Sequence, residues 1–218
     1  MWDVWHATPT APMLIEQPPL LYRLLFPEAL WRIKRQSGQQ VFITFDDGPI
    51  PQVTPWVLDT LDRHGGGNVK ATFFMVGQNV ERYPELLREV LDRGHAVGNH
   101  SMHHLQGFKV TTKRYLRDIA EAARLIPSDL YRPPHGIMRW AQSAALKEHF
   151  NIVMYDLITR DYSRKVPPEE VLDNVKSYAR NGSIIVFHDS LKAERNLRYA
   201  LPRALDWLAD RGFTFARL

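Results

Sequence analysis

From Gln40 onward the chain alternates short apolar runs with longer amphipathic stretches, and this alternation limits the folds that it can adopt. The apolar runs are rich in β-branched and aromatic residues, as strands are. They cover residues 40–45, 70–76, 95–98, 130–132, 152–156, 183–188 and 213–216. Strands that alternate with helices favour a mainly parallel sheet. About seven such units predict an α/β fold, either a small barrel or an open doubly wound sheet, and periodicity does not separate the two.

Helix start and stop signals lie between these runs. Thr54-Pro55 predicts an N-cap followed by proline at the first helical position, and Pro84 opens another helix. Gly182 and Gly212 stand where helix stops are expected. The predicted helices cover residues 56–64, 84–93, 112–126, 140–148, 168–179 and 195–210.

Composition removes several classes of function. The chain has no cysteine, so disulfides, thiolate nucleophiles and sulfur-bound metals are excluded, and any metal must be held by His, Asp or Glu. The net charge of +4 arises from 28 basic and 24 acidic residues that are scattered along the chain. This pattern predicts a solvated mixed surface and no nucleic-acid partner, although a weakly basic face would suit an anionic glycan.

The first 39 residues are predicted to be an N-terminal arm and a peripheral segment that packs on one main domain, residues 40–218. A signal peptide begins with basic residues, whereas this segment has the acidic Asp3 near its start. Arg23 and Glu28 interrupt the most apolar part of the segment. It therefore reads as neither a signal peptide nor a membrane span. The expected location is cytoplasmic, with export or envelope association expected instead if the true N-terminus lies upstream. The oligomeric state is not predicted.

Unusual polar residues follow the ends of the predicted strands. They are Asp46 and Asp47, residues 99–104, residues 132–136, Asp161, and His188 with Asp189. Parallel α/β folds place active sites at the carboxyl ends of their strands, where the loops converge. This coincidence predicts a functional site at that edge.

Two groups of these residues can bind and activate a metal. Asp46 and Asp47 are adjacent, so one carboxylate can bind a cation while the other stays free, although Asp and Gly also favour plain turns. His100 and His104 share a face if they lie on a helical turn, with His103 as the competing second ligand. Two histidines and one carboxylate suit catalytic zinc or an iron oxygenase. A spare base in Asp46 and an acid in His188 favour hydrolysis.

Residues 132–136 (RPPHG) form a rigid strand exit, which is either a turn or part of the site. In the second case Arg132 pairs with a carboxylate, and the backbone N–H of His135 points at developing negative charge. Proline has no N–H, so His135 is the first possible donor after the proline pair.

Five ordered motifs over about residues 40–218 resemble the polysaccharide deacetylases, also called carbohydrate esterase family 4. They are residues 44–49 (TFDDGP), 100–104 (HSMHH), 132–136 (RPPHG), 155–162 (YDLITRDY) and 184–189 (IIVFHD). The resemblance implies a distorted (β/α) barrel of about seven parallel strands, similar to a TIM barrel. It also implies a divalent ion, usually Zn²⁺ with Co²⁺, Ni²⁺ or Fe²⁺ as alternatives, held by Asp47, His100 and His104.

The same resemblance implies roles for the remaining residues. Asp46 would deprotonate the water that attacks the acetamide carbonyl, and His188 would protonate the leaving amine. Arg132 and Asp161 would form a pair that orients Asp46, and the His135 N–H would stabilise the oxyanion. Pro134, Tyr162 and Ile185 would lie on the substrate side. His135 stands where the family commonly has Tyr, and Tyr162 where it commonly has Trp, which puts the substrate preference in doubt.

Three functions are compatible with these motifs. The leading one is removal of N-acetyl groups from amino-sugar glycans of the chitooligosaccharide or peptidoglycan type. The second is hydrolysis of another acyl bond, such as an O-acetyl ester or a cyclic amide. The third is a glycan-binding module without catalysis, which retention of the base, the acid and three candidate ligands disfavours.

Overall fold

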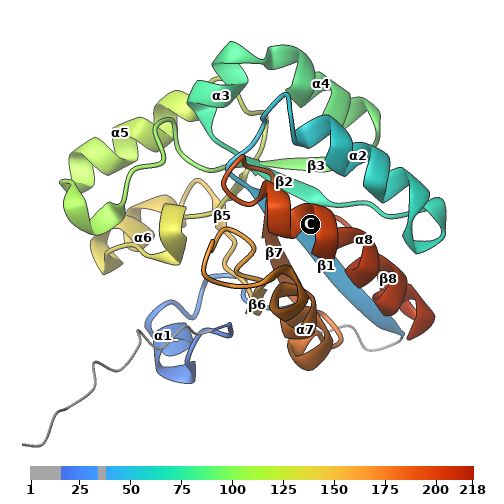
Figure 1. Cartoon of the computed structure of the whole chain (residues 1–218). Helices are drawn as coiled ribbons and strands as arrows, with labels where there is room; N and C mark the ends of the chain where they lie inside the picture. Colours follow the sequence, from blue (N-terminus) through green and yellow to red (C-terminus); the bar gives the residue numbers. More distant parts are fainter. Residues whose placement is uncertain (1–15, 34–37) are drawn as a thin grey trace, which may run out of the picture.

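The computed structural model describes residues 16–33 and 38–218, and its centre is a curled parallel sheet (Figure 1). The strand order is β5-β4-β3-β2-β1-β7-β6, and β8 pairs with β1 at one end. All paired strands run parallel. The strands are β1 (Gln39–Asp46), β2 (Thr72–Met75), β3 (Ala96–Asn99), β4 (Leu130–Tyr131), β5 (Asn151–Ile152), β6 (Leu157–Ile158), β7 (Ile184–His188) and β8 (Phe213–Phe215). The predicted α/β barrel with parallel strands is confirmed as a curled half-barrel, open between β5 and β6.

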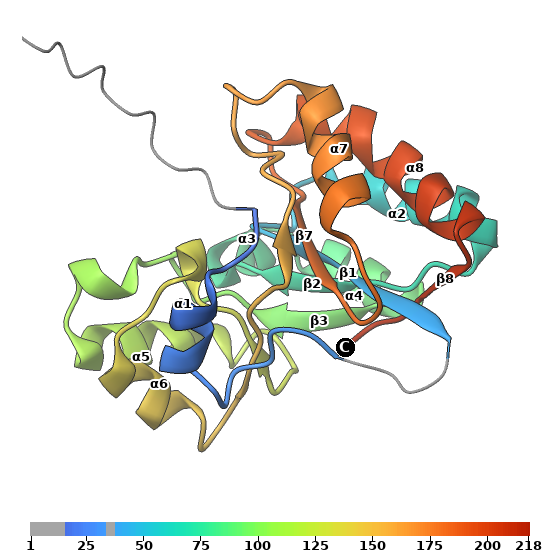
Figure 2. The ribbon, with the colours of Figure 1, turned by 90° about the horizontal axis from the view of Figure 1, so that it is seen from below.

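Helices cover the outer face of the curled sheet, as the two views show (Figures 1 and 2). They are α1 (Leu20–Leu25), α2 (Thr54–Arg63), α3 (Gly77–Arg82), α4 (Pro84–Asp92), α5 (Thr112–Ala122), α6 (Trp140–Leu146), α7 (Pro168–Tyr178) and α8 (Glu194–Asp210). The six predicted helices are confirmed to within a few residues, and the structure adds α1 and α3. Gly182 and Gly212 have φ of 84° and 77°, a conformation that favours glycine at helix stops.

The core explains why the strands are so apolar. The last six residues of β1 are all buried, because helices pack on one face while the barrel interior fills the other. A large apolar cluster joins the outer faces of β1, β2 and β7 to α2, α7 and α8. A small cluster of Phe42, Phe74, Val153 and Ile184 fills the interior. This packing holds the carboxyl ends of the strands in fixed positions.

Two local predictions are wrong. Instead of one strand at residues 152–156, β5 ends at Ile152 and β6 begins at Leu157, each paired to a different neighbour. Thr54 is the first residue of α2 and not its N-cap. Its hydroxyl accepts from the Ile50 N–H and donates to Asp189 at 2.6 Å, so it ties the β1–α2 loop to the loop after β7.

Residues 16–33 close the gap between β5 and β6. Leu30 forms a parallel bridge with Val153, the Ile158 N–H donates to the Glu16 carbonyl, and Arg23 contacts Asp156 at 3.0 Å. The first fifteen residues of the predicted arm lie outside the described residues, so the boundary after residue 39 stays a prediction. Within the described ranges, no helix is long and apolar enough to cross a membrane.

Candidate active site

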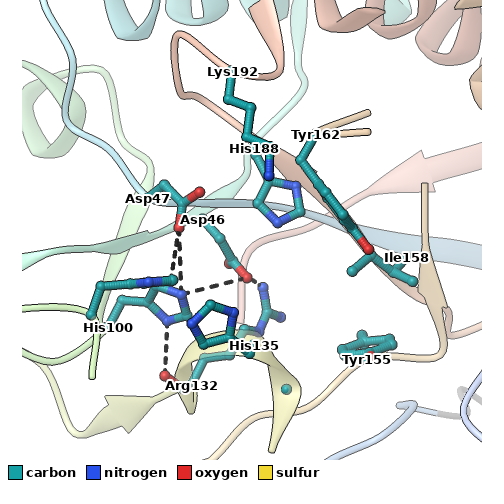
Figure 3. Close-up of a pocket in the computed structure, with 12 residues that line it drawn as sticks. Asp46, Asp47, His100, Arg132, His135, Tyr155, Ile158, Tyr162, His188 and Lys192 are labelled. Atoms are coloured by element: carbon teal, nitrogen blue, oxygen red, sulfur yellow. Dashed lines mark hydrogen bonds and ion pairs between the residues drawn. The ribbon is translucent and has the colours of Figure 1, made fainter. Parts of the chain in front are cut away.

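A cavity of about 260 Å³ lies at the carboxyl ends of the strands, where the sequence predicted the site (Figure 3). Acidic, imidazole and aromatic side chains from six loops converge in it. The lining residues are Asp46, Asp47, His100, His104, Arg132, His135, Gly136, Tyr155, Ile158, Tyr162, His188 and Lys192. The architecture therefore brings together residues that are up to 146 positions apart in the sequence.

The two adjacent carboxylates point to different neighbours because the chain turns between them. Asp46 is the last residue of β1 and lies in register with His188 of β7. Asp47 has a φ of 80°, a left-handed conformation that Asp tolerates better than most residues. The next N–H, that of Gly48, donates to Asp189, and a Cβ on Gly48 would overlap the Asp189 carboxylate. Glycine is thus required for this turn.

Asp46 is held by Arg132. One guanidinium nitrogen of Arg132 donates to Asp46 Oδ1 at 2.6 Å and to the Thr44 hydroxyl at 2.8 Å. The rest of the guanidinium donates to the carbonyls of Val153 and Met154 and lies over the Phe74 ring. Burial lowers the pKa of Arg132, although the charge of Asp46 opposes this shift. Asp46 is therefore fixed through one oxygen while Oδ2 faces His100 at 4.0 Å.

Asp47, His100 and His104 form a cluster that suits a divalent metal. Their candidate ligand atoms all lie within 4.8 Å of one another, with Nε2 of His104 and His100 at 3.1 Å and 3.8 Å from Asp47 Oδ1. His100 Nδ1 lies 2.8 Å from the Arg132 carbonyl, which can only accept, so Nδ1 carries the proton and Nε2 is free to bind an ion. Among the described residues, no other group of His, Asp or Glu meets the same proximity criterion. The donor set fits zinc with positions left for water and substrate.

The local charges favour the metal-binding forms of these ligands. Burial lowers the pKa of His100 to about 4, despite the opposing charges of Asp46 and Asp47, so its imidazole is neutral at pH 7. Burial alone would raise the pKa of Asp47, but the hydrogen bond from His104 and the nearby His188 and His100 hold it well below the usual range. A neutral imidazole and an ionised carboxylate are the forms that bind metals.

His100 and His104 meet for a different reason from the predicted one. Residues 100–104 are not helical, and positive φ values at Ser101 (65°) and His104 (53°) fold the loop so that both rings face Asp47. The competing ligand His103 points away and contacts Asp118 of α5 at 2.7 Å. The pairing of His100 with His104 is confirmed, while the helical turn is wrong.

His188 is paired with Asp161. The ring Nδ1 lies 2.8 Å from Asp161 Oδ1, and the backbone N–H of His188 donates to Oδ2 at 2.8 Å. Burial lowers the pKa of His188, but the charge and hydrogen bond of Asp161 outweigh this, and the pKa is raised to about 9. The predicted pair between Arg132 and Asp161 is wrong, because Arg132 binds Asp46 on one side of the cavity and Asp161 binds His188 on the other.

The strand exit after β4 brings His135 to the cavity. His135 has a φ of 62°, its ring lies 4.7 Å from that of His104, and Gly136 follows with a φ of 65°. The Tyr22 hydroxyl of α1 donates to the Gly136 carbonyl at 2.7 Å, so the N-terminal segment supports this turn. Pro134 is buried beneath the turn and does not line the cavity, in contrast to its predicted place on the substrate side.

Two further predicted residues have different outcomes. Tyr162 lines the cavity, with its ring 4.9 Å from that of His188. Ile185 does not, because neighbouring residues of a strand face opposite sides and Ile185 packs in the outer core with Phe187. Its placement on the substrate side is wrong.

Sequence reasoning did not single out Tyr155, Ile158 or Lys192, which also line the cavity. Tyr155 lies between β5 and β6, and Ile158 is the second residue of β6, in a stretch where the sequence predicts one strand and a motif. Lys192 follows the β7 motif by a few residues. A single lysine after a strand has no second residue at a fixed spacing, so no sequence pattern predicts its place in the site. The position of the β7–α8 loop over the cavity is a tertiary feature.

Comparison with known proteins agrees with this geometry. The sequence profile of the polysaccharide deacetylase family matches residues 33–153. A peptidoglycan-N-acetylglucosamine deacetylase of Bacillus cereus is 33% identical over 183 residues, which is 80% of this chain and 84% of that protein. In a second B. cereus protein of the same name, the match covers 69% of this chain but only 56% of the relative. The crystal structure of a peptidoglycan N-acetylglucosamine deacetylase superposes with a TM-score of 0.81 at 29% identity and covers 92% of this chain and 95% of that one.

Proposed function

This chain belongs to the polysaccharide deacetylase family, and on that premise we propose that it is a metal-dependent hydrolase that removes N-acetyl groups from amino-sugar glycans of the peptidoglycan or chitooligosaccharide type. The observation that supports this function best is the placement of a carboxylate, Asp46, and an imidazole paired with a carboxylate, His188, in one cavity with the metal-ligand cluster.

Asp46 is proposed as the general base. Its Oδ1 is held by Arg132, and its Oδ2 faces the cavity beside His100. A carboxylate in this position can take one proton from water while the water oxygen attacks the acetamide carbonyl carbon. Arg132 acts on the reaction through Asp46, since its donors all contact protein groups.

His188 is proposed as the general acid. An amide nitrogen leaves only when it is protonated, so breaking the C–N bond requires a donor. With its pKa raised to about 9, His188 is protonated at neutral pH, and Nδ1 is occupied by Asp161 so that Nε2 faces the cavity. The proton passes to the amine as acetate is released. An ester leaving group needs less help from an acid, so amide hydrolysis depends on His188 more than ester hydrolysis does.

The cation is proposed to be Zn²⁺ held by Asp47, His100 and His104. A divalent ion at this position lowers the pKa of water and polarises a bound carbonyl. The turn at His135 is proposed to direct its backbone N–H at the oxyanion, and Tyr162 to contact the acetyl group from beside His188.

An assay on three substrates tests the function. The protein loaded with Zn²⁺ is incubated with chitooligosaccharides, peptidoglycan and acetylated xylan, and released acetate and new amines are measured. We expect acetate and amine in equal amounts from the amino-sugar substrates. Cleavage of acetylated xylan alone would show an O-acetyl esterase, and no release from any substrate with metal bound would show a binding module.

The metal is tested separately. Protein freed of metal by a chelator is dialysed against Zn²⁺, Co²⁺, Ni²⁺ or Fe²⁺, and bound metal is measured by elemental analysis. We expect one equivalent of bound Zn²⁺ and loss of activity in the chelated form. Full activity without bound metal would contradict the proposed cofactor.

A further inference from the structure

The charges that line the cavity are nearly all paired within the protein. Arg132 is paired with Asp46 at 2.6 Å, and His188 with Asp161 at 2.8 Å. Asp47 faces His100 and His104, with which it forms the metal-ligand cluster. The ring of His135 lies against that of His104, with the ring centroids 4.7 Å apart. Lys192 is the remaining charged group.

Lys192 differs from the other cations because no carboxylate balances it. Among residues 16–33 and 38–218, its contact is with the face of Tyr162, whose ring centroid lies 5.4 Å from Nζ. This contact directs the side chain over a residue of the cavity wall, and Figure 3 shows Lys192 above His188 and Tyr162. Because Lys192 is exposed and its ammonium lies beside a ring of the cavity wall, it is positioned to meet a ligand.

The size of the cavity limits where an anionic group could be attached to the ligand. A volume of about 260 Å³ is below the ~300–1,000 Å³ of typical small-molecule sites, so only part of a glycan enters it. A substituent that reaches Lys192 while the acetamide lies between Asp46 and His188 must therefore belong to the reacting sugar or to the sugar next to it.

We infer that Lys192 binds a carboxylate of the glycan and makes the enzyme selective for anionic over neutral N-acetylated substrates. This inference rests on the proposed function and specifies its substrate class. In peptidoglycan strands from which the stem peptides have been removed, lactyl ethers on alternate sugars supply such carboxylates, and each ether is attached to the carbon next to the acetamide-bearing carbon. Chitooligosaccharides have no charge for Lys192 to bind. Selectivity comes from a charged contact that only one of the two substrates can make.

Three matched substrates test the inference. The first is peptidoglycan glycan strands freed of peptides, whose lactyl carboxylates are ionised. The second is the same strands with those carboxylates converted to methylamides, and the third is a neutral chitooligosaccharide. Lys192→Met removes the charge and keeps the length of the side chain, and Lys192→Arg keeps the charge. Lys147→Met, at the exposed C-cap of α6 and away from the cavity, is the control.

We expect Lys192→Met to lower kcat/KM about three- to tenfold on the carboxylated strands, through a higher KM, because a partly exposed charged contact is worth this much. Its kcat/KM on the other two substrates should match that of the unaltered protein, and Lys192→Arg should restore binding of the carboxylated strands. Added salt should raise KM only for the carboxylated strands. Mass spectrometry of the products then shows whether the acetyl group leaves the carboxylated sugar or its neighbour.

Two results would overturn the inference. Equal kcat/KM for Lys192→Met and the unaltered protein on the carboxylated strands would show that the contact is absent. An equal loss on all three substrates would show a general effect on the cavity. In both cases acetate is still released, so the proposed function stands. It fails only if the metal-loaded, unaltered protein releases no acetate from any substrate.

Discussion

Asp46 and Asp47 are covalent neighbours, yet their surroundings give them different chemistry. Asp46 accepts a hydrogen bond from the Arg132 guanidinium, which also donates to three other protein groups. Asp47 instead faces the imidazoles of His100 and His104. The positive φ of Asp47 separates the two carboxylates without any intervening residue. The proposed division into a base and a ligand therefore depends on one backbone turn.

Substitution of these neighbours should separate the two roles. We expect Asp46→Asn to lower kcat about 10²–10⁴-fold while bound metal stays at one equivalent, because the base is lost and the ligands remain. His100→Ala should lose the metal along with the activity. Acetate release and elemental analysis on the same samples check both. Substantial activity in Asp46→Asn would remove Asp46 as the base.

The acid has a testable pH dependence. Since Asp161 raises the pKa of His188 from 6.5 to about 9, the acid is present below pH 9 and its contribution is lost as pH rises through 9. In Asp161→Asn, burial remains while the largest raising charge and its hydrogen bond are gone and only Asp46 and Asp47 still raise the pKa, so the pKa should fall well below 9. NMR titration of the His188 ring in metal-free protein measures this directly. An unchanged titration would contradict the assigned pair.

The sequence predicted the identity of the site residues better than their partners. His188 and Asp161 both follow strands, which indicated a place at the rim, but pairing depends on which side chains face each other across the curled sheet. The same limit explains Ile185. A shift of one residue along β7 moves a side chain from the cavity side to the outer core.

The loop between β3 and α5 is the element that brings the ligands together. Asp118 of α5 accepts from the backbone N–H groups of Met102 and His103 and also contacts the His103 ring. These three contacts fix the turn that aims His100 and His104 at Asp47. His103 thus supports the metal site from outside it.

Loss of this support should weaken metal binding. We expect Asp118→Ala to reduce Zn²⁺ affinity about 10–100-fold, as is usual for residues that orient metal ligands from behind. His103→Ala should change it less, because the two backbone contacts remain. Competition with a chromophoric chelator measures the affinities. A loss in His103→Ala as large as that in His100→Ala would show that His103 is a ligand after all.

Helices with clear start and stop residues were predicted from the sequence almost to their ends, as for α4 between Pro84 and Asp92. The short elements were not. Strand β6 has two residues and is defined by its pairing with β7, so no local pattern marks it. α3 ends just before α4 begins and has no side-chain cap at its start, so no helix start signal predicts it.

At the scale of the whole molecule, the open side of the barrel is held by one buried carboxylate. Asp156 is fully buried and contacts Arg23 at 3.0 Å, Arg180 at 2.6 Å and the Ser183 hydroxyl at 2.8 Å. It joins the N-terminal segment to the segments around β6 and β7. Burial raises its pKa, but the hydrogen bonds from Arg180 and Ser183 outweigh this and lower it.

Asp156→Asn should destabilise the fold. We expect a loss of about 2–3 kcal/mol in the free energy of unfolding at pH 7, somewhat below the value for a wholly buried pair because Arg180 is half-exposed. Since the pKa of Asp156 is lowered in the folded protein, this contribution is fully present above pH 3.8, the usual value. It is lost as the pH falls from 3.8 through the lowered pKa of the folded state. Urea denaturation at pH 7 and pH 3 checks it. The control Asp173→Asn removes an exposed pair with Lys176 and should cost less than about 0.5 kcal/mol.

The sequence also left part of the architecture open. Alternation predicted parallel strands, and the family motifs narrowed the choice to a barrel. Neither indicated that residues 16–33 would lie against both edges of the opening, because the contacts there join residues that are far apart in the sequence. The predicted cytoplasmic location stays a prediction.

The placement of residues 16–33 has a consequence for the order of assembly. Glu16 finds its partner Arg160 across 144 positions of sequence, and Arg23 reaches Asp156 across 133. On the ribosome, the segment that seals the barrel is made before either edge that it seals. It stays without its partners until most of the chain has emerged from the ribosome. During that time the leucines of α1 that are exposed in the folded protein, Leu20, Leu21, Leu24 and Leu25, are exposed as well. The first described residues to be synthesised are therefore among the last to reach their place, and long-range closure of this kind slows folding.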